Sequence, residues 1–285
     1  MSSFKIRTDL ALEARENMDD AAEECRGVSV EEEYDQKSEI RITRVVIETK
    51  NGAKAMGKPI GTYITLEAPA MALPDEDYHQ EIAGELARQL RRIIPGLEGE
   101  QSVIIPELEK ESSILVVGLG NRDVTADALG PNVVDNLIIT RHMVKEYGKA
   151  AYNQNRIHMI SGLIPGVMAK TGMESQEIIK GVVEQTKPDV VVVIDALAAR
   201  STKRLNRTIQ VTNTGIHPGS GVGNNRNAIT KEALGVPVIA IGVPTVVDAA
   251  TIVNDALERM MRQAGEEPIK LKEELWHSLG ELYNM

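Results

Sequence analysis

Two periods of hydrophobic and polar residues divide the first part of this chain into predicted strands and a helix. Residues 39–49 and 60–69 alternate apolar and polar side chains, which predicts strands with one buried face. The intervening residues 50–59 contain Asn-Gly and a second glycine, so we expect a turn there. Residues 75–94 repeat apolar side chains every three or four positions, which predicts an amphipathic helix that ends at the following Pro-Gly.

From residue 113 onward, unbroken apolar runs replace this alternation. Such runs are typical of strands that are buried on both faces of a parallel sheet. They alternate with segments of helical period, one of which begins with a capping-box pattern, Thr171 followed by Glu174. The predicted strands are 113–117, 156–161, 188–195, 208–212 and 237–242, and the predicted helices are 131–145, 172–187 and 248–263. This order predicts an α/β fold with a mainly parallel sheet flanked by helices.

The first 38 residues differ in composition from the rest of the chain. Acidic residues cluster there, and apolar residues are too few to build a core. We therefore expect a peripheral arm outside a single domain of residues 39–285. Aromatic residues make up only 3% of the chain, so the core of that domain must be aliphatic, which suits strands rich in Val and Ile.

The charge and the apolar stretches exclude several classes of partner. The formal net charge of the 285 residues is −10, which argues against binding to nucleic acid or to an anionic membrane. No apolar stretch approaches the roughly 18 residues of a membrane span, and the N-terminus lacks the apolar region of a signal peptide. Cys25 is the single cysteine, which excludes an internal disulfide and a Cys-rich zinc site. We expect a soluble intracellular protein.

Two aspartates follow two of the predicted buried strands and are the leading candidates for chemistry. Asp127 lies after the strand at 113–117 and the turn Gly118-Leu119-Gly120-Asn121, and Asp195 ends the strand at 188–195. Taken singly, each is better interpreted as a cap of the helix or turn that follows it. Both follow strands of one predicted sheet, however, so they can converge, and two nearby carboxylates can divide the roles of base and acid toward a water molecule.

Two glycine-rich stretches require separate interpretation. The turn at 118–121 lacks the third glycine of a dinucleotide fingerprint and has Asp123 where a pyrophosphate would lie, so the nucleotide interpretation is weak. The stretch 214–224, TGIHPGSGVGN, fits no regular element and is a candidate anion-binding nest, active-site loop or subunit contact. His217 within it would complete a metal site with the two aspartates; we favour a locally bonded surface histidine.

The motifs together resemble the germination proteases of spore-forming bacteria, which degrade small acid-soluble spore proteins. The resemblance covers residues 113–249 almost continuously, and an N-terminal stretch, RTDLALEARE at 7–16, is similar to the family's propeptide. The matching motifs are GLGN-x-x-VT-x-DALGP (118–131), TRH (140–142), PGVM-x-x-TG (165–172), IDALAARS (194–201), TGIHPGSGVGN (214–224) and GVPVIAIGVPTVVDA (235–249).

The resemblance implies an atypical aspartic endopeptidase with Asp127 and Asp195 as its two essential aspartates, no cofactor and no bound metal. It implies a fold related to hydrogenase-maturation proteases, a homotetramer, and a location in the cytoplasm of the developing spore. It also implies a zymogen that cleaves itself after an acidic residue followed by a hydrophobic residue and Ala. Asp9-Leu10-Ala11 fits that rule, so we predict a propeptide of residues 1–9, an arm of residues 10–38, and a catalytic block at 113–249.

The sequence departs from the family pattern beside the first aspartate. Arg122-Asp123 replaces the usual aromatic-polar pair, and Ala126 replaces the usual proline. Asp123 adds a third carboxylate, which we expect to raise the pKa values of its neighbours if it lies close to them. Two alternatives therefore stay open beside the aspartic endopeptidase: a metal-dependent peptidase of the same fold, and a non-catalytic homologue that binds spore proteins.

Overall fold

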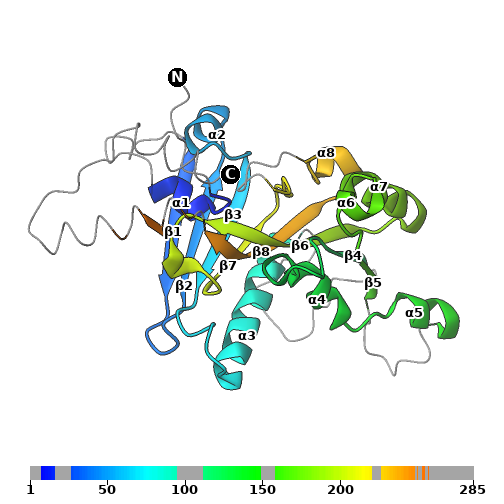
Figure 1. Ribbon diagram of the computed structural model, residues 1–285, viewed down its shortest axis with the longest axis horizontal. Coiled ribbons are helices and arrows are strands. Elements are labelled where there is room, and N and C mark those ends of the chain that lie inside the picture. Colours follow the sequence, from blue (N-terminus) through cyan, green and yellow to red (C-terminus); the bar gives the residue numbers. More distant parts are fainter. Residues whose placement is uncertain are drawn as a thin grey trace, which may run out of the picture.

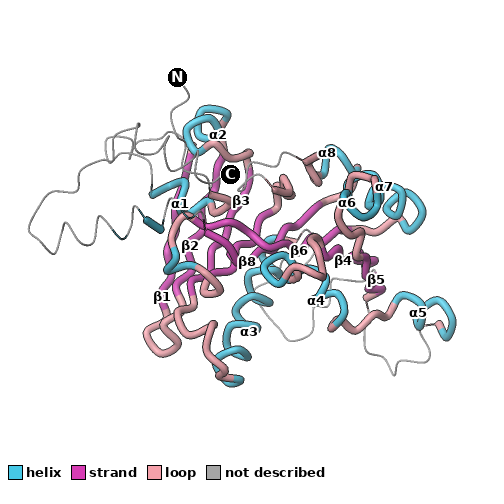
Figure 2. The backbone as a smooth tube through the Cα atoms, in the orientation of Figure 1, coloured by secondary structure: helices cyan, strands magenta, loops and turns pink. Residues whose placement is uncertain are grey.

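The computed structural model describes residues 8–16, 27–94, 112–148, 158–219 and 226–247, together with positions 249, 252, 253 and 256. In these residues the chain builds one eight-stranded sheet with the strand order β1-β2-β3-β7-β8-β6-β4-β5 (Figures 1 and 2). The strands are β1 Val28–Tyr34, β2 Arg41–Ile47, β3 Gly61–Glu67, β4 Ser113–Gly118, β5 Met159–Leu163, β6 Val190–Ala199, β7 Thr208–Thr212 and β8 Val238–Val247.

The sheet is mixed, so the prediction of a mainly parallel sheet is wrong. Strands β5, β4, β6 and β8 run parallel to one another, as the apolar runs predict. Strands β1, β2, β3 and β7 form an antiparallel half, and β7 joins that half to β8 in antiparallel register. Strands β1 and β2 pair through residues 35–40, a connection too short for the crossover that parallel strands need.

Helices cover both faces of the sheet. Figure 1 shows α3 and α4 below the sheet and α2, α6, α7 and α8 above it. The lower core contains apolar side chains of α3 and of the antiparallel strands, and the upper core contains those of α7, α8 and the parallel strands. The helices are α1 Ala11–Glu16, α2 Lys50–Met56, α3 Glu76–Ile93, α4 Leu129–Asp135, α5 Arg141–Tyr147, α6 Met168–Thr171, α7 Ser175–Thr186 and α8 Lys231–Leu234. No helix in the described part of the chain is long and apolar enough to cross a membrane.

Local capping explains where the helices differ from the prediction. Residues 50–56 form α2 rather than a simple turn because the Thr49 side chain accepts a hydrogen bond from the Gly52 amide, and Gly57 ends the helix with φ 62°. Helix α7 is capped by a box of Glu174 and Glu177, so the predicted box with Thr171 is wrong.

Several other predicted elements have different bounds in the structure. The single helix predicted at 131–145 is two helices, α4 and α5. Strands β6 and β8 extend to residues 199 and 247, beyond their predicted ends. The helix predicted at 248–263 lies almost wholly outside the described residues.

The N-terminal segment is integrated into the domain more closely than its composition predicts. Leu10 and Ala11 are fully buried, and Ala11 contacts the apolar cluster of α2, β2 and β3. Residues 28–34 form the edge strand β1, whose side chains are mostly exposed. The expected peripheral arm therefore describes β1 better than it describes residues 10–13, where a few apolar side chains fill gaps left by other elements.

Candidate active site

Strand β6 carries Asp195 past the end of its neighbour. Strand β4 pairs with β6 only as far as Gly118 opposite Ile194, whereas β8 pairs with β6 as far as Ala199. Asp195 thus lies inside β6 and one residue beyond β4, at the carboxyl edge of the parallel half of the sheet. Its side chain is 7% exposed, and its Oδ1 accepts a hydrogen bond from the Ala196 amide at 2.9 Å. Asp195 does not cap a turn at 196–197, because those residues continue the strand.

Asp127 lies at the corresponding edge, at the end of a short 3₁₀ helix, Thr125–Asp127, that precedes α4. The cap position of α4 is Ala128, and no side chain caps that helix, so Asp127 is not its cap. Its Oδ2 instead accepts a hydrogen bond from the Asn121 amide at 2.7 Å. The Thr245 hydroxyl on β8 donates to the Ala126 carbonyl at 2.6 Å, so Thr245 fixes this turn rather than capping a later helix.

Glycines allow α4 to approach the sheet closely enough to place Asp127 there. A Cβ atom at Gly130 would lie 2.4 Å from the Leu119 carbonyl oxygen and 2.5 Å from that of Ile194. A Cβ at Gly120, which has φ 110°, would lie 2.0 Å from the backbone oxygen of Asp127. These glycines therefore serve close backbone contact between β4, β6 and the turn, in place of the phosphate contact that a dinucleotide fingerprint provides.

Both aspartates line one cleft of about 420 Å³ at this edge of the sheet. Asp9 from the N-terminal segment and His217 from the glycine-rich loop line the same cleft. Most of the remaining wall comes from the turn after β4, the segment from residue 166 to the start of α7, and strands β6, β7 and β8, and Lys58, Pro59 and Tyr63 also line it. The cleft thus brings together segments that are more than 200 residues apart in the sequence.

The two carboxyl groups have different electrostatic environments. Burial raises the pKa of Asp195 to about 8, and the nearby Asp127 and Asp9 raise it as well. Burial also raises the pKa of Asp127, but the hydrogen bond from the Asn121 amide favours its ionised form. At neutral pH Asp195 therefore holds a proton, while Asp127 accepts a hydrogen bond that favours its ionised form. This is the asymmetry that a base and an acid acting together require.

Asp9 lies beside β6 and is bound to Ala198 through both its backbone and its side chain. The Asp9 amide donates to the Ala198 carbonyl at 3.0 Å, and the Ala198 amide donates to Asp9 Oδ2 at 2.9 Å. Leu10, the residue that follows, is buried against Leu197 and Ala199. The predicted cleavage site Asp9-Leu10 is therefore bound at the edge of the strand that carries Asp195.

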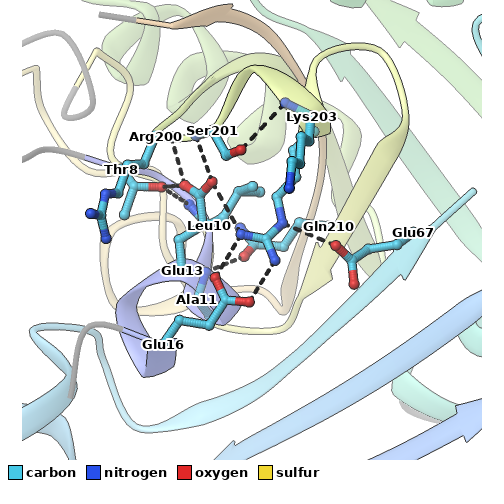
Figure 3. A network of polar contacts seen from close by, with 11 residues as sticks. Thr8, Leu10, Ala11, Glu13, Glu16, Glu67, Arg200, Ser201, Lys203 and Gln210 are labelled. Atoms are coloured by element: carbon cyan, nitrogen blue, oxygen red, sulfur yellow. Dashed lines mark hydrogen bonds and ion pairs between the residues drawn. The ribbon is translucent and has the colours of Figure 1, made fainter. Parts of the chain in front are cut away.

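A network of polar contacts anchors α1 behind this segment (Figure 3). The Glu13 carboxylate is 1% exposed and accepts hydrogen bonds from the Arg200 amide at 2.7 Å and the Ser201 amide at 3.0 Å. The Arg204 guanidinium forms ion pairs with Glu13, Glu16 and Glu67. Several charged groups satisfy one another here, so the network holds residues 9–16 against β6 and β7.

Other predicted residues lie elsewhere or have other roles. Asp123 is exposed and paired with Lys170, and it does not line the cleft, so the expectation that it raises the pKa values of the pair is wrong. Arg122 pairs with Asp135 at 2.6 Å. His217 lines the cleft, but the described residues contain no group of three His, Cys, Asp or Glu side chains placed to bind a metal ion. Cys25 and residues 220–225 lie outside the described residues.

Two residues of the cleft were missed by sequence reasoning. Lys58 follows α2, and its ammonium group donates to the backbone oxygens of Thr8 and Asp9. Gln210 in β7 hydrogen-bonds the backbone of Asp9 and Ala11. The sequence held one signal for Gln210: it is a polar amide residue at the centre of the short predicted strand 208–212.

Comparison with known proteins identifies the family. The family model described as germination protease matches residues 6–280. A germination protease of Caldanaerobacter subterraneus subsp. tengcongensis is 51% identical over 265 residues, covering 93% of this chain and 76% of that protein. The germination protease of Bacillus subtilis strain 168 is 45% identical over 271 residues, covering 94% of this chain and 70% of that protein. The chain belongs to the germination protease family.

Membership of this family makes the chain a peptidase. The geometry alone shows a cleft with two aspartates, and the family indicates that such a cleft is a candidate site of peptide cleavage. The matched residues include both aspartates, the glycine turns that position them and the N-terminal segment that lies beside them. We therefore treat the cleft as the candidate active site of this germination protease.

Proposed function

We propose that this germination protease is an aspartic endopeptidase in which Asp127 and Asp195 together activate a water molecule. Asp127 acts as the base that takes a proton from the water, and Asp195 donates a proton to the leaving amine. The substrates are small acid-soluble spore proteins, and the reaction starts their degradation at germination. The observation that carries this proposal is the pair of unlike carboxyl groups in one cleft, with Asp9 bound beside them.

The same observation supports synthesis as a zymogen that cleaves itself between Asp9 and Leu10. Asp9 lines the cleft of the two aspartates, and its backbone amide donates a hydrogen bond to the Ala198 carbonyl of β6. The backbone on the amino side of the predicted cleavage site is thus bound beside the two aspartates, as the backbone of a substrate would be. The resemblance noted above supplies the remaining expectations: a fold related to hydrogenase-maturation proteases, a homotetramer, and the spore cytoplasm as location.

The test is turnover of a peptide containing Glu-Leu-Ala by Asp127→Asn and Asp195→Asn. We expect each variant to lose at least about 100-fold in kcat, since each removes one proton-transfer group. Asp123→Asn is the matched control, because Asp123 is an exposed aspartate of the same turn, and it should retain activity. Wild-type activity in either of the first two variants would rule out the pair.

The pH dependence tests the assignment of roles. Asp195 must be protonated to act as the acid, so kcat/KM should fall as pH rises through its pKa of about 8. A rate that keeps rising from pH 7 to pH 9 would contradict the assignment.

A chelator distinguishes the metal-dependent alternative, which the position of His217 in the cleft keeps open. The aspartic mechanism predicts full turnover after exhaustive treatment with EDTA, whereas a metal-dependent peptidase would lose activity and regain it with added metal. Binding of spore proteins without any cleavage would instead support a non-catalytic role.

A further inference from the structure

The two aspartates provide for proton transfer but leave one part of the reaction without a partner. When water adds to a peptide carbonyl, negative charge develops on the carbonyl oxygen, and active sites of this kind place hydrogen-bond donors there. In the proposed mechanism Asp127 takes the proton of the water and Asp195 gives its proton to the leaving amine, so other groups are needed to stabilise that oxygen. The chain itself shows which groups meet such an oxygen, because its own Asp9, the residue before the predicted scissile bond, lines the cleft.

Two side chains converge on the carbonyl oxygen of Asp9. The Lys58 ammonium group lies 2.9 Å from it, and the side-chain amide nitrogen of Gln210 lies 3.1 Å from it. Both are donors, and both distances are those of ordinary hydrogen bonds. This carbonyl is the one that precedes the predicted scissile bond.

We propose that Lys58 and Gln210 form the oxyanion-binding half of the active site and are catalytic residues for peptide hydrolysis. This inference rests on the proposed function of Asp127 and Asp195. The oxygen of the water bonds to the Asp9 carbonyl carbon, the carbonyl electron pair moves to the oxygen held by Lys58 and Gln210, and the proton of the water goes to Asp127. The C–N bond then breaks, and the proton of Asp195 goes to the Leu10 nitrogen, giving a carboxylic acid and an amine.

The contacts of Gln210 suit a residue that positions any peptide irrespective of its side chains. Its amide nitrogen donates to the Asp9 carbonyl, while its amide oxygen accepts from the Ala11 amide at 2.6 Å. The side chain therefore spans the scissile bond and holds the backbone on both sides of it. Gln210 is 7% exposed in a strand paired on both edges, so the amide is rigidly placed before substrate arrives.

Lys58 has the environment of a donor to a developing charge. Burial lowers its pKa, and the nearby carboxylates of Asp9 and Glu13 offset part of that lowering by favouring the charged form. Its ammonium group also donates to the Thr8 carbonyl at 3.3 Å. A hydrogen bond from such a group to an oxyanion gains strength where solvent is excluded.

The competing explanation is that Lys58 and Gln210 only clamp the N-terminal segment in place. The two explanations differ in whether residues 8–16 stay bound when cleavage is lost. A clamp that fails releases residues 8–16, whereas a lost oxyanion donor slows the reaction of a segment that is still bound. Self-cleavage and binding of the segment must therefore be measured on the same variants.

The experiment compares full-length Lys58→Met and Gln210→Glu with wild type and with Lys54→Met. Lys54 is an exposed lysine of α2 and serves as the matched control. Gln210→Glu is nearly isosteric and keeps the acceptor for the Ala11 amide, but it lacks the donor. Self-cleavage is followed by intact mass, hydrogen exchange reports protection of residues 8–16, and turnover of Thr-Asp-Leu-Ala-Leu-Glu is measured per processed chain.

We expect the Lys58→Met and Gln210→Glu variants to cleave themselves about 100-fold or more slowly with protection of residues 8–16 unchanged. On the peptide, kcat should fall while KM changes less than about threefold, and Lys58→Arg should recover part of the loss because it retains a cation. Cleavage at the wild-type rate, or a loss that only follows reduced protection, would overturn the proposal. If Lys58→Met does not fold, Gln210→Glu decides alone.

Asp127→Asn in the same assays separates the two hypotheses. If it also cleaves normally, the proposed function has failed. If it is inactive while the Lys58 and Gln210 variants turn over normally, only the oxyanion assignment has failed. If wild type does not cleave itself, peptide turnover decides between the outcomes.

Discussion

Asp195 should make this protein less stable as the pH rises, and its replacement by Asn should remove that dependence. The carboxyl group is 7% exposed and its pKa in the folded chain is about 8, against the ordinary value of 3.8. Between these two values the folded chain binds a proton that the unfolded chain has released. The stability of the fold therefore falls with rising pH, by about 1.4 kcal/mol per pH unit.

The pH interval between the two pKa values sets how far the free energy of unfolding falls. From pH 5 to pH 8, Asp195 alone should lower the free energy of unfolding by about 3 to 4 kcal/mol, since at pH 8 the folded chain is about half deprotonated. Asn has nearly the same shape, accepts the hydrogen bond from the Ala196 amide and carries no charge. Asp195→Asn should therefore be more stable than wild type by about 1 to 2 kcal/mol at pH 5 and by about 5 kcal/mol at pH 8, and the two should match only below about pH 4.

Urea unfolding of both proteins at half-unit steps from pH 5 to pH 9 measures this difference directly. Because Asp127 and Asp9 raise the pKa of Asp195, Asp127→Asn should lower that pKa, so the fall in stability should end at a lower pH while its slope stays the same. A constant difference between wild type and Asp195→Asn at every pH would refute the reasoning. So would a variant that is less stable at pH 8, because the buried proton would then not reside on Asp195.

The remaining predictions concern the elements that position the cleft. Gly130→Ala should destabilise the fold by about 2 kcal/mol or more in thermal unfolding, because the new Cβ would clash with the backbone at the end of β4 and in β6. The control Gly84→Ala has open space around it and should be neutral or stabilising by about 1 kcal/mol. Leu10→Ala should cost about 2 to 5 kcal/mol, and an unchanged midpoint would mean that Leu10 is not buried in solution. Glu13→Gln should weaken the pairing with Arg204 and expose residues 9–16 to limited proteolysis; unchanged resistance would contradict the anchoring role.

Periodicity predicted the elements well where a helix or strand buries one continuous face or is buried on both faces. The helix predicted at 75–94 is α3, and the apolar runs at 113–117 and 188–195 are β4 and the first part of β6. Unbroken apolar runs predicted the parallel strands, and the alternating segments that form β2 and β3 are typical of antiparallel pairing. The prediction of a mainly parallel sheet gave these segments too little weight, although β2, β3 and β7 were themselves predicted as strands.

The sequence predicted those residues of the candidate site whose position follows from a local pattern. Asp127 and Asp195 each follow buried strands, and that position is visible in the sequence. Lys58 and Gln210 act on the backbone of a segment about 50 and 200 residues away, and such contacts leave no local pattern. The misplaced role of Asp123 shows the converse, since closeness in sequence to Asp127 did not bring the two carboxyl groups together.

The pairing of Asp9 with β6 has a consequence for the kinetics of activation. The segment at the cleft belongs to the same molecule as the two aspartates, so the self-cleavage proposed above would be a unimolecular event. The half-life of the full-length chain should then be independent of protein concentration over a 100-fold dilution. On the same proposal the bound segment excludes other peptides until it is cleaved, so progress curves for an added substrate should begin with a lag whose length matches that half-life.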